Sequence, residues 1–194
     1  IERALHDQSV EVQRHAIDAL AAQPINKALN TLSRTIFDAH APWEARMSAL
    51  QHITKHAGPE ANDLLVSCVR NAELPLYMRI HAVEALGNAD ANVAALLALA
   101  GDAQVHPELR ITAVHVLGRS EQSHVIDELQ TLLYGPDLPF GLAEAICDAL
   151  GQLGQRHERI AQVSFTLMHV LNSVTTDVGL TLAVIRALGV LGDE

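Results

Sequence analysis

The chain contains few aromatic residues, few cysteines and no long apolar run. Aromatic residues make up 3% of its 194 residues, a composition that disfavours a β-sandwich, whose strands favour Val, Ile, Tyr and Phe. Cys68 and Cys147 are the two cysteines, and each lies in an apolar helical pattern, so we expect buried thiols and no disulfide. Because no stretch of about 18 apolar residues occurs, no membrane span is predicted.

Positive charge is also scarce. The formal net charge is -10 with neutral histidines, and no run of Lys or Arg reverses it locally, so the sequence predicts no nucleic-acid partner. The cysteine usage suits a reducing compartment, which makes the cytoplasm the expected location. Since the first residue is Ile1, we expect a segment of a longer protein, with other domains of the parent chain among its contacts.

What the chain does contain is an internal repeat. The segments Val12–Leu20 and Met78–Leu86 align with small or apolar residues at positions 0, 4, 7 and 8, counted from the first residue of each segment. This nine-residue frame occurs six times, with starts at residues 12, 45, 78, 109, 142 and 180. Positions 4, 7 and 8 share one face of a helix with position 0, so each frame predicts a helix with a packed stripe.

Between the frames lie further apolar stripes at helical spacing, such as Leu64, Leu65 and Cys68, which predict a first helix before each later frame helix, whereas the first repeat lacks most of its first helix. Each repeat is thus a helical hairpin whose second helix carries the frame. Prolines precede four frames, where a helix can begin without their missing N–H: Pro42, Pro75, Pro107 and Pro139. Glycines occupy position 9 of four frames, where we expect them to end the second helix: Gly87, Gly118, Gly151 and Gly189.

This pattern resembles HEAT repeats, in particular the short type of phycobilisome lyase-like proteins. The resemblance implies an all-α, right-handed α-solenoid of about six antiparallel helix hairpins, related to armadillo-like helical folds, as one domain over residues 1–194. Arg46, Arg79 and Arg110 match the family's arginine at position 1. With acidic residues in the turns just before, such as Asp38, Glu73 and Asp102, they are expected to form a structural ladder. Gln13, Ala143 and Thr181 depart from the pattern.

Polar residues recur on the second helices and define a candidate partner-binding face, here called the second-helix face. Position 6 supplies most of them and position 3 adds a histidine: Asp18, Gln51, His81, Glu84, His115 and Asp148. In HEAT-like proteins this side of the array is where partners bind. Its carboxylates would suit a basic peptide or protein, whereas the alternative interpretation is a face that is merely solvated.

No motif in the sequence predicts catalysis or a metal centre. His52 and His56 are four residues apart on one helix, but His52 fills a packing position and no third ligand has a fitting spacing. Deoxyhypusine hydroxylase, a HEAT-like dimetal enzyme, uses repeated His-Glu pairs, whereas this chain has one, His157-Glu158, expected at the start of a first helix. We therefore expect no catalytic residue, no metal site, no cofactor and no enzymatic activity.

The predicted function is that of a protein-protein interaction scaffold or docking module. An alternative, implied by the resemblance alone, is a bilin lyase-like or lyase-chaperone protein that binds a tetrapyrrole. A second alternative is a structural spacer between domains. Trp43, Tyr77 and Phe140 recur near the starts of three frames, and they are expected either to pack across adjacent turns or to form an apolar edge for a partner.

Overall fold

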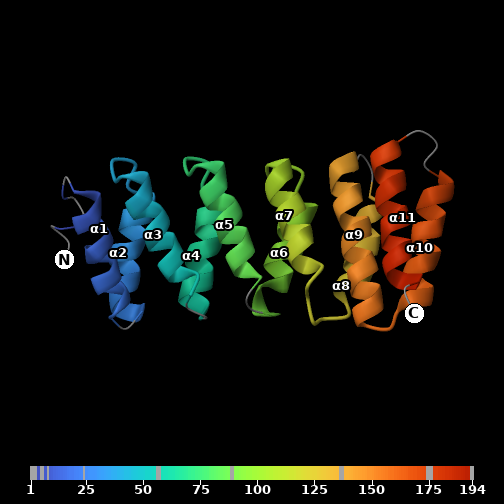
Figure 1. Cartoon of the computed structure of the whole chain (residues 1–194), viewed down its shortest axis with the longest axis horizontal. Helices are drawn as coiled ribbons and strands as arrows, with labels where there is room; N and C mark the ends of the chain where they lie inside the picture. The colour runs from blue at the N-terminus through green and yellow to red at the C-terminus, as the bar shows by residue number, and fades with distance from the viewer. Residues whose placement is uncertain are drawn as a thin grey trace. The chain divides into compact units, whose positions relative to one another are not determined.

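The computed structural model describes residues 4, 7, 9–23, 25–55, 58–87, 90–135, 138–173 and 177–192. Within them the chain forms α-helices and no strand (Figure 1). The helices are α1 (Val10–Ala21), α2 (Ile25–Phe37), α3 (Trp43–Ile53), α4 (Pro59–Arg70), α5 (Leu76–Leu86), α6 (Val93–Gly101), α7 (Pro107–Leu117), α8 (Val125–Leu133), α9 (Phe140–Arg156), α10 (Ile160–Ser173) and α11 (Val178–Gly192), with a short 3-10 helix η2 (Asp90–Asn92) before α6.

The helices alternate as the repeat predicts. The six frames lie in α1, α3, α5, α7, α9 and α11, and the helices between them are the first helices of the hairpins. Contacts divide the chain into two compact units, Ile1–Asn88 with α1 to α5 and Ala89–Glu194 with α6 to α11. The predicted all-α array of helical hairpins is therefore confirmed, and the single domain over residues 1–194 stays a prediction.

The frame positions explain why these helices pack. Position 4 is buried in all six frames, where it is occupied by Ala16, Ala49, Ala82, Ala113, Ile146 and Val184. Four of the six are alanine, which lets a neighbouring helix approach closely. Burial of apolar surface contributes about 25 cal/mol per Å², so the shared stripe stabilises the packing of neighbouring helices within each of the two units.

The prolines start the second helices as expected. Pro42, Pro75 and Pro139 are the N-cap residues of α3, α5 and α9, and Pro107 is the first residue of α7. A first-turn N–H has no partner within its own helix, so a proline there removes no hydrogen bond.

The prediction for the glycines is correct at two positions and wrong at two. Gly87 and Gly118 follow the last residues of α5 and α7, whereas Gly151 and Gly189 lie inside α9 and α11. Gly151 is buried, and a Cβ on it would lie 2.9 Å from the Cα of Ala187. The glycine is needed there for close approach of two helices, and α9 continues to Arg156.

Helix α9 ends in a C-terminal capping motif that does not use Gly151. Glu158 has φ 56, in the left-handed region, and the backbone N–H of Arg159 donates to the carbonyl oxygen of Gly154 at 2.9 Å. The N–H of Glu158 donates to Gln155 at 3.3 Å, which completes the hydrogen-bond pair of a Schellman motif. The His157-Glu158 dipeptide therefore lies in the turn between α9 and α10, just before the first helix on which it was expected.

Candidate interaction surface

In the N-terminal unit the second-helix face is polar and exposed. Asp18, Gln51 and Glu84 occupy position 6 on α1, α3 and α5, and all three side chains are exposed. Asp18 Oδ1 lies 3.7 Å from His52 Nε2, and Glu84 Oε2 lies 3.2 Å from Nδ1 of half-buried His81. Both carboxylates therefore have a histidine beside them, which offsets their charge only when it is protonated.

In the C-terminal unit the same face carries a stronger ion pair. His115 is exposed on α7, whereas Asp148 on α9 is half-buried. Asp148 accepts hydrogen bonds from Arg186 of α11, with 2.8 Å between Oδ2 and Nη2. This hydrogen bond, and then the charge of Asp148, raises the pKa of the Arg186 guanidinium above its ordinary value. Asp18 and Glu84, rather than Asp148, are thus the carboxylates of this face without an arginine partner among the described contacts.

The three family-matching arginines make one and the same contact. Each donates from Nε to the carbonyl oxygen ten residues earlier: Arg46 to Ile36 at 2.9 Å, Arg79 to Val69 at 2.8 Å, and Arg110 to Ala100 at 2.9 Å. These carbonyl groups lie in the last turns of α2, α4 and α6, where no intrahelical donor remains for them. We propose that the arginines form a structural ladder that holds each second helix against the end of its own first helix.

The turns before these arginines also share one conformation. Asp38, Asn71 and Asp102 each stand eight residues before an arginine, and each accepts a 2.9 Å hydrogen bond from the backbone N–H two residues later. This is the Asx-turn, in which a short polar side chain replaces a backbone acceptor. In the middle turn the acceptor is Asn71, not the acidic Glu73 singled out from the sequence.

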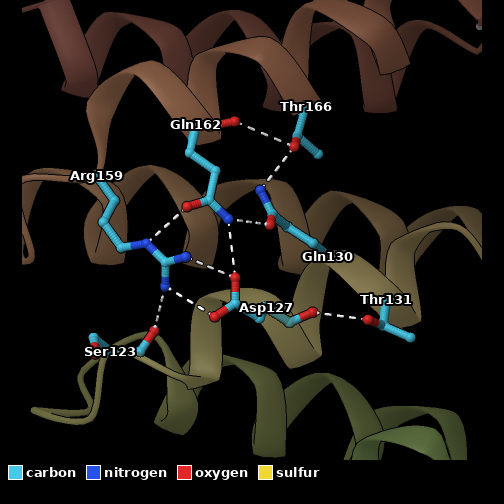
Figure 2. Close-up of polar contacts among 7 residues, drawn as sticks. All are labelled: Ser123, Asp127, Gln130, Thr131, Arg159, Gln162 and Thr166. Carbon is cyan, nitrogen blue, oxygen red and sulfur yellow. Dashed lines mark hydrogen bonds and ion pairs between the residues drawn. The ribbon is translucent and has the colours of Figure 1, made fainter.

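Sequence reasoning missed a polar network that joins the first helices α8 and α10 (Figure 2). Arg159 holds Asp127 through two hydrogen bonds, of 2.7 and 3.0 Å, and its Nε donates to Gln162 at 2.8 Å. Gln162 donates in turn to Asp127 and to Gln130, and Gln130 donates to Thr166. The hydrogen bonds from Arg159 and Gln162 lower the pKa of the Asp127 carboxyl.

The spacing of this network offered one signal. Asp127 and Arg159 are separated by 32 residues, close to the 33 residues between most frame starts, although the frames of these two hairpins start 38 residues apart, at 142 and 180. From the sequence alone both residues are typical of a solvated face.

The two cysteines are free and buried, as predicted. Burial raises the pKa of the Cys68 thiol to about 12. The pKa of the Cys147 thiol is also raised to about 12, chiefly by burial and then by the negative charges of Asp148 and Glu144. Because the thiolate is the nucleophile, neither side chain is activated for chemistry.

Metal-ligating residues are dispersed. In the described ranges, no group of three His, Cys, Asp or Glu side chains could hold a metal ion. His56, the partner of His52 in the predicted pair, lies outside the described residues. His157 donates from Nε2 to the carbonyl oxygen of Ser120 at 3.2 Å, which ties the turn after α9 to the turn after α7.

Several large apolar side chains are exposed. Trp43, Tyr77 and Phe140 are 59%, 44% and 58% exposed, which favours the apolar-edge interpretation over packing across turns. Phe165 on α10 and Val178 on α11 are more exposed still. No single helix in the described part of the chain is long and apolar enough to cross a membrane, although one broken pair, Leu76–Leu86 with Asp90–Gly101, passes that test by length and composition together.

No family model matches the chain, and no curated protein sequence matches it. Among solved structures, the chain is similar to human deoxyhypusine hydroxylase in complex with glycerol, with 15% identity and a TM-score of 0.55 over 100% of this chain and 83% of that chain. It is also similar to the complex of CpcE and CpcF of phycocyanin lyase from Nostoc sp. PCC7120, with 16% identity and a TM-score of 0.38 over 98% and 92% of the two chains.

These comparisons correct one prediction. The expectation that the chain is not an enzyme is wrong on this finding, because a solved structure that is similar over the whole length of this chain is that of an enzyme, a hydroxylase. Identity of 15% assigns no reaction to this chain, since one fold hosts many chemistries. What the likeness shows is the fold, and it is a HEAT-like helical fold.

Proposed function

We propose that the chain is a protein-interaction module whose second-helix face receives a basic peptide or protein. The observation that carries this proposal is the register of Asp18, Gln51 and Glu84. They occupy one frame position on three consecutive second helices, and all three are exposed. Equivalent side chains from stacked repeats present a row with the spacing of the repeat, which suits an extended partner.

Charge supports a basic partner. The net charge of -10 attracts cationic groups from a distance. Exposed ion pairs contribute about 0.2–1 kcal/mol each, so affinity would come from several contacts along the row. Charges at the surface mainly raise the association rate and fix the register of the partner.

The test is fluorescence anisotropy with a labelled lysine- and arginine-rich peptide, together with an acidic peptide of equal length. We expect the double substitution Asp18→Asn and Glu84→Gln to weaken binding of the basic peptide by about 3- to 10-fold, since two exposed charge contacts are lost. The matched control is Glu60→Gln with Asp63→Asn, which removes two exposed carboxylates from the first helix α4. Equal weakening by the two double variants would contradict use of the second-helix face.

The other interpretations drawn from the sequence stay predictions. They are a lyase-like role with a tetrapyrrole, a spacer between domains of a longer chain, and a cytoplasmic location. The peptide experiment separates the first two from the interaction module, because neither requires the second-helix face to discriminate between basic and acidic peptides.

A further inference from the structure

A histidine lies beside each carboxylate of the second-helix face in the N-terminal unit. Nδ1 of His81 on α5 is 3.2 Å from Oε2 of Glu84 on the same helix, which is hydrogen-bonding distance. Nε2 of His52 on α3 is 3.7 Å from Oδ1 of Asp18 on α1, a distance that fits an ion pair better than a hydrogen bond. One contact lies within a helix and the other joins two second helices, yet each brings an imidazole to the carboxylate at position 6.

The sequence repeats the first of these arrangements on α1. His15 and Asp18 hold positions 3 and 6 of the first frame, as His81 and Glu84 do in the third. Residues three apart are neighbours on a helix, and His15 is exposed. Asp18 therefore has one histidine a turn away on its own helix and a second one on α3.

The other charged groups around this face keep their charge near neutral pH. Arg14 and Lys55, both exposed, stand at helical spacing from Asp18 and His52, and Arg46 and Arg79 bind carbonyl groups of the first helices. The phenol of Tyr77, four residues before His81, carries no charge in this range. The first helices packed against α3 and α5 contribute exposed charges only: Lys27 and Arg34 from α2, and Glu60, Asp63 and Arg70 from α4.

The histidines reverse the charge of this face as the pH falls. An imidazole ordinarily gains its proton between pH 8 and pH 5, whereas carboxylates stay ionised down to about pH 4. At pH 8 the three histidines are neutral beside the two negative charges of Asp18 and Glu84. At pH 5 the same five groups carry one net positive charge, and the permanent cations are unchanged. A basic partner is attracted in the first state and repelled in the second.

We propose that pH controls this face: it holds a basic partner while His15, His52 and His81 are neutral and releases it when they are protonated. The inference rests on the proposed function and adds its regulation. Protons on the imidazoles and cationic groups of the partner compete for the same two carboxylates. By linkage, each therefore weakens the binding of the other by the same factor.

The test uses fluorescence anisotropy with a lysine- and arginine-rich peptide that lacks histidine and is blocked at both termini, so that its own charge is equal at pH 8 and pH 6. The readout is the ratio of the Kd at pH 6 to the Kd at pH 8, at constant salt. For the parent chain we expect a ratio of about 10. All eleven histidines of the chain gain charge over this range, so the variants rather than the parent decide the matter.

His52→Gln combined with His81→Gln removes the two imidazoles that contact the carboxylates and replaces them with amides that stay neutral. We expect the Kd ratio to fall by about 3-fold or more. The matched control is His106→Gln with His124→Gln, at two exposed histidines of the C-terminal unit. This control changes the charge of the whole chain equally and should keep the ratio of the parent. Equal ratios for the two double variants would overturn the proposal.

A second pair of variants covers the half-buried site of His52. If urea unfolding shows that the double variant is destabilised, His81→Gln alone is expected to lower the ratio by about 2-fold, with His124→Gln as its control. The same ratio in both single variants would then overturn the proposal.

Failure of the proposed function gives a different result. In that case the parent chain does not bind the basic peptide at pH 8, or binds the acidic peptide equally well, and both proposals fall. Failure of the pH control alone leaves selective binding of the basic peptide at pH 8, with the histidine variants and their controls alike.

Discussion

Two regions of the chain hold their helices together in different ways. From α2 to α7, a polar contact lies inside each hairpin, where Arg46, Arg79 and Arg110 of the second helices bind carbonyl groups of the first helices. From α8 to α11, the distinctive contacts join one hairpin to the next. They are the Arg159 and Asp127 network between α8 and α10 and the glycine-alanine contact between α9 and α11.

The difference shows which contacts of a repeat array depend on the neighbouring hairpin and which do not. An arginine that caps its own first helix needs no particular neighbour beyond its own hairpin. A glycine that admits an alanine needs the correct residue on the adjacent hairpin. The C-terminal region therefore depends on the order of its repeats more than the arginine-containing region does.

The residues that replace arginine at position 1 agree with this contrast. Ala143 is buried in α9. Thr181 donates a hydrogen bond from its hydroxyl to the carbonyl oxygen of Asp177, four residues earlier, at 2.7 Å. Gln13 of the first frame donates to the Asp7 carbonyl, and its buried Oε1 has no hydrogen-bond partner among the described residues. None of the three makes the hydrogen bond by which the arginines reach the carbonyl oxygen ten residues earlier.

The largest effect is expected for Gly151→Val, in the C-terminal region. The new side chain would meet the backbone of Ala187, and overpacking of this kind costs about 2–3 kcal/mol. Urea unfolding measures the loss of free energy. Gly189→Val, at the same frame position with no described atom within 4 Å, should change stability by less than about 0.5 kcal/mol. Equal effects at the two glycines would refute the close-approach role of Gly151.

A smaller loss is expected in the arginine-containing region. Arg110 is 7% exposed, so Arg110→Met would leave the Ala100 carbonyl without its donor, at a cost of about 2 kcal/mol. Arg79→Met at a half-buried site should cost about 1 kcal/mol. Exposed Arg119 provides the control, and Arg119→Met should be nearly neutral. If all three variants unfold at the same urea concentration as the parent, the ladder has no structural role.

The smallest effect is expected for Asp127→Asn and depends on pH. Because the folded-state pKa of Asp127 is lowered, its stabilisation is present above the unfolded-state value of about 4 and lost as the pH falls through the lowered value. The side chain is 56% exposed, so the loss at pH 7 should stay under about 1 kcal/mol. The difference in the free energy of unfolding between Asp127→Asn and the parent should vanish near pH 2. Urea unfolding at several pH values measures it.

The neighbouring exposed carboxylate on α8 provides the control for this pH dependence. Glu128→Gln should show a smaller difference from the parent at pH 7. A loss for Asp127→Asn that is the same at pH 2 and pH 7 would show that the charge of Asp127 is not the cause.

Local pattern predicted the helices well because each helix depends on residues within a few turns. The frame stripe, the prolines at helix starts and the arginine at position 1 all act over about ten residues, so their spacing is visible in the sequence. The second-helix face was found in the same way, since position 6 falls on the exposed side of α1, α3 and α5. Its use by a partner stays a proposal.

The sequence by itself determined the alternation of helices, their buried stripes and the free buried thiols, because periodicity and apolar burial act within a hairpin. Only the tertiary structure decided that Gly151 admits Ala187 instead of ending α9, and that Arg159 holds Asp127. Each of these depends on which residue of another hairpin lies opposite, and that is set by the stacking of repeats, not by any local pattern.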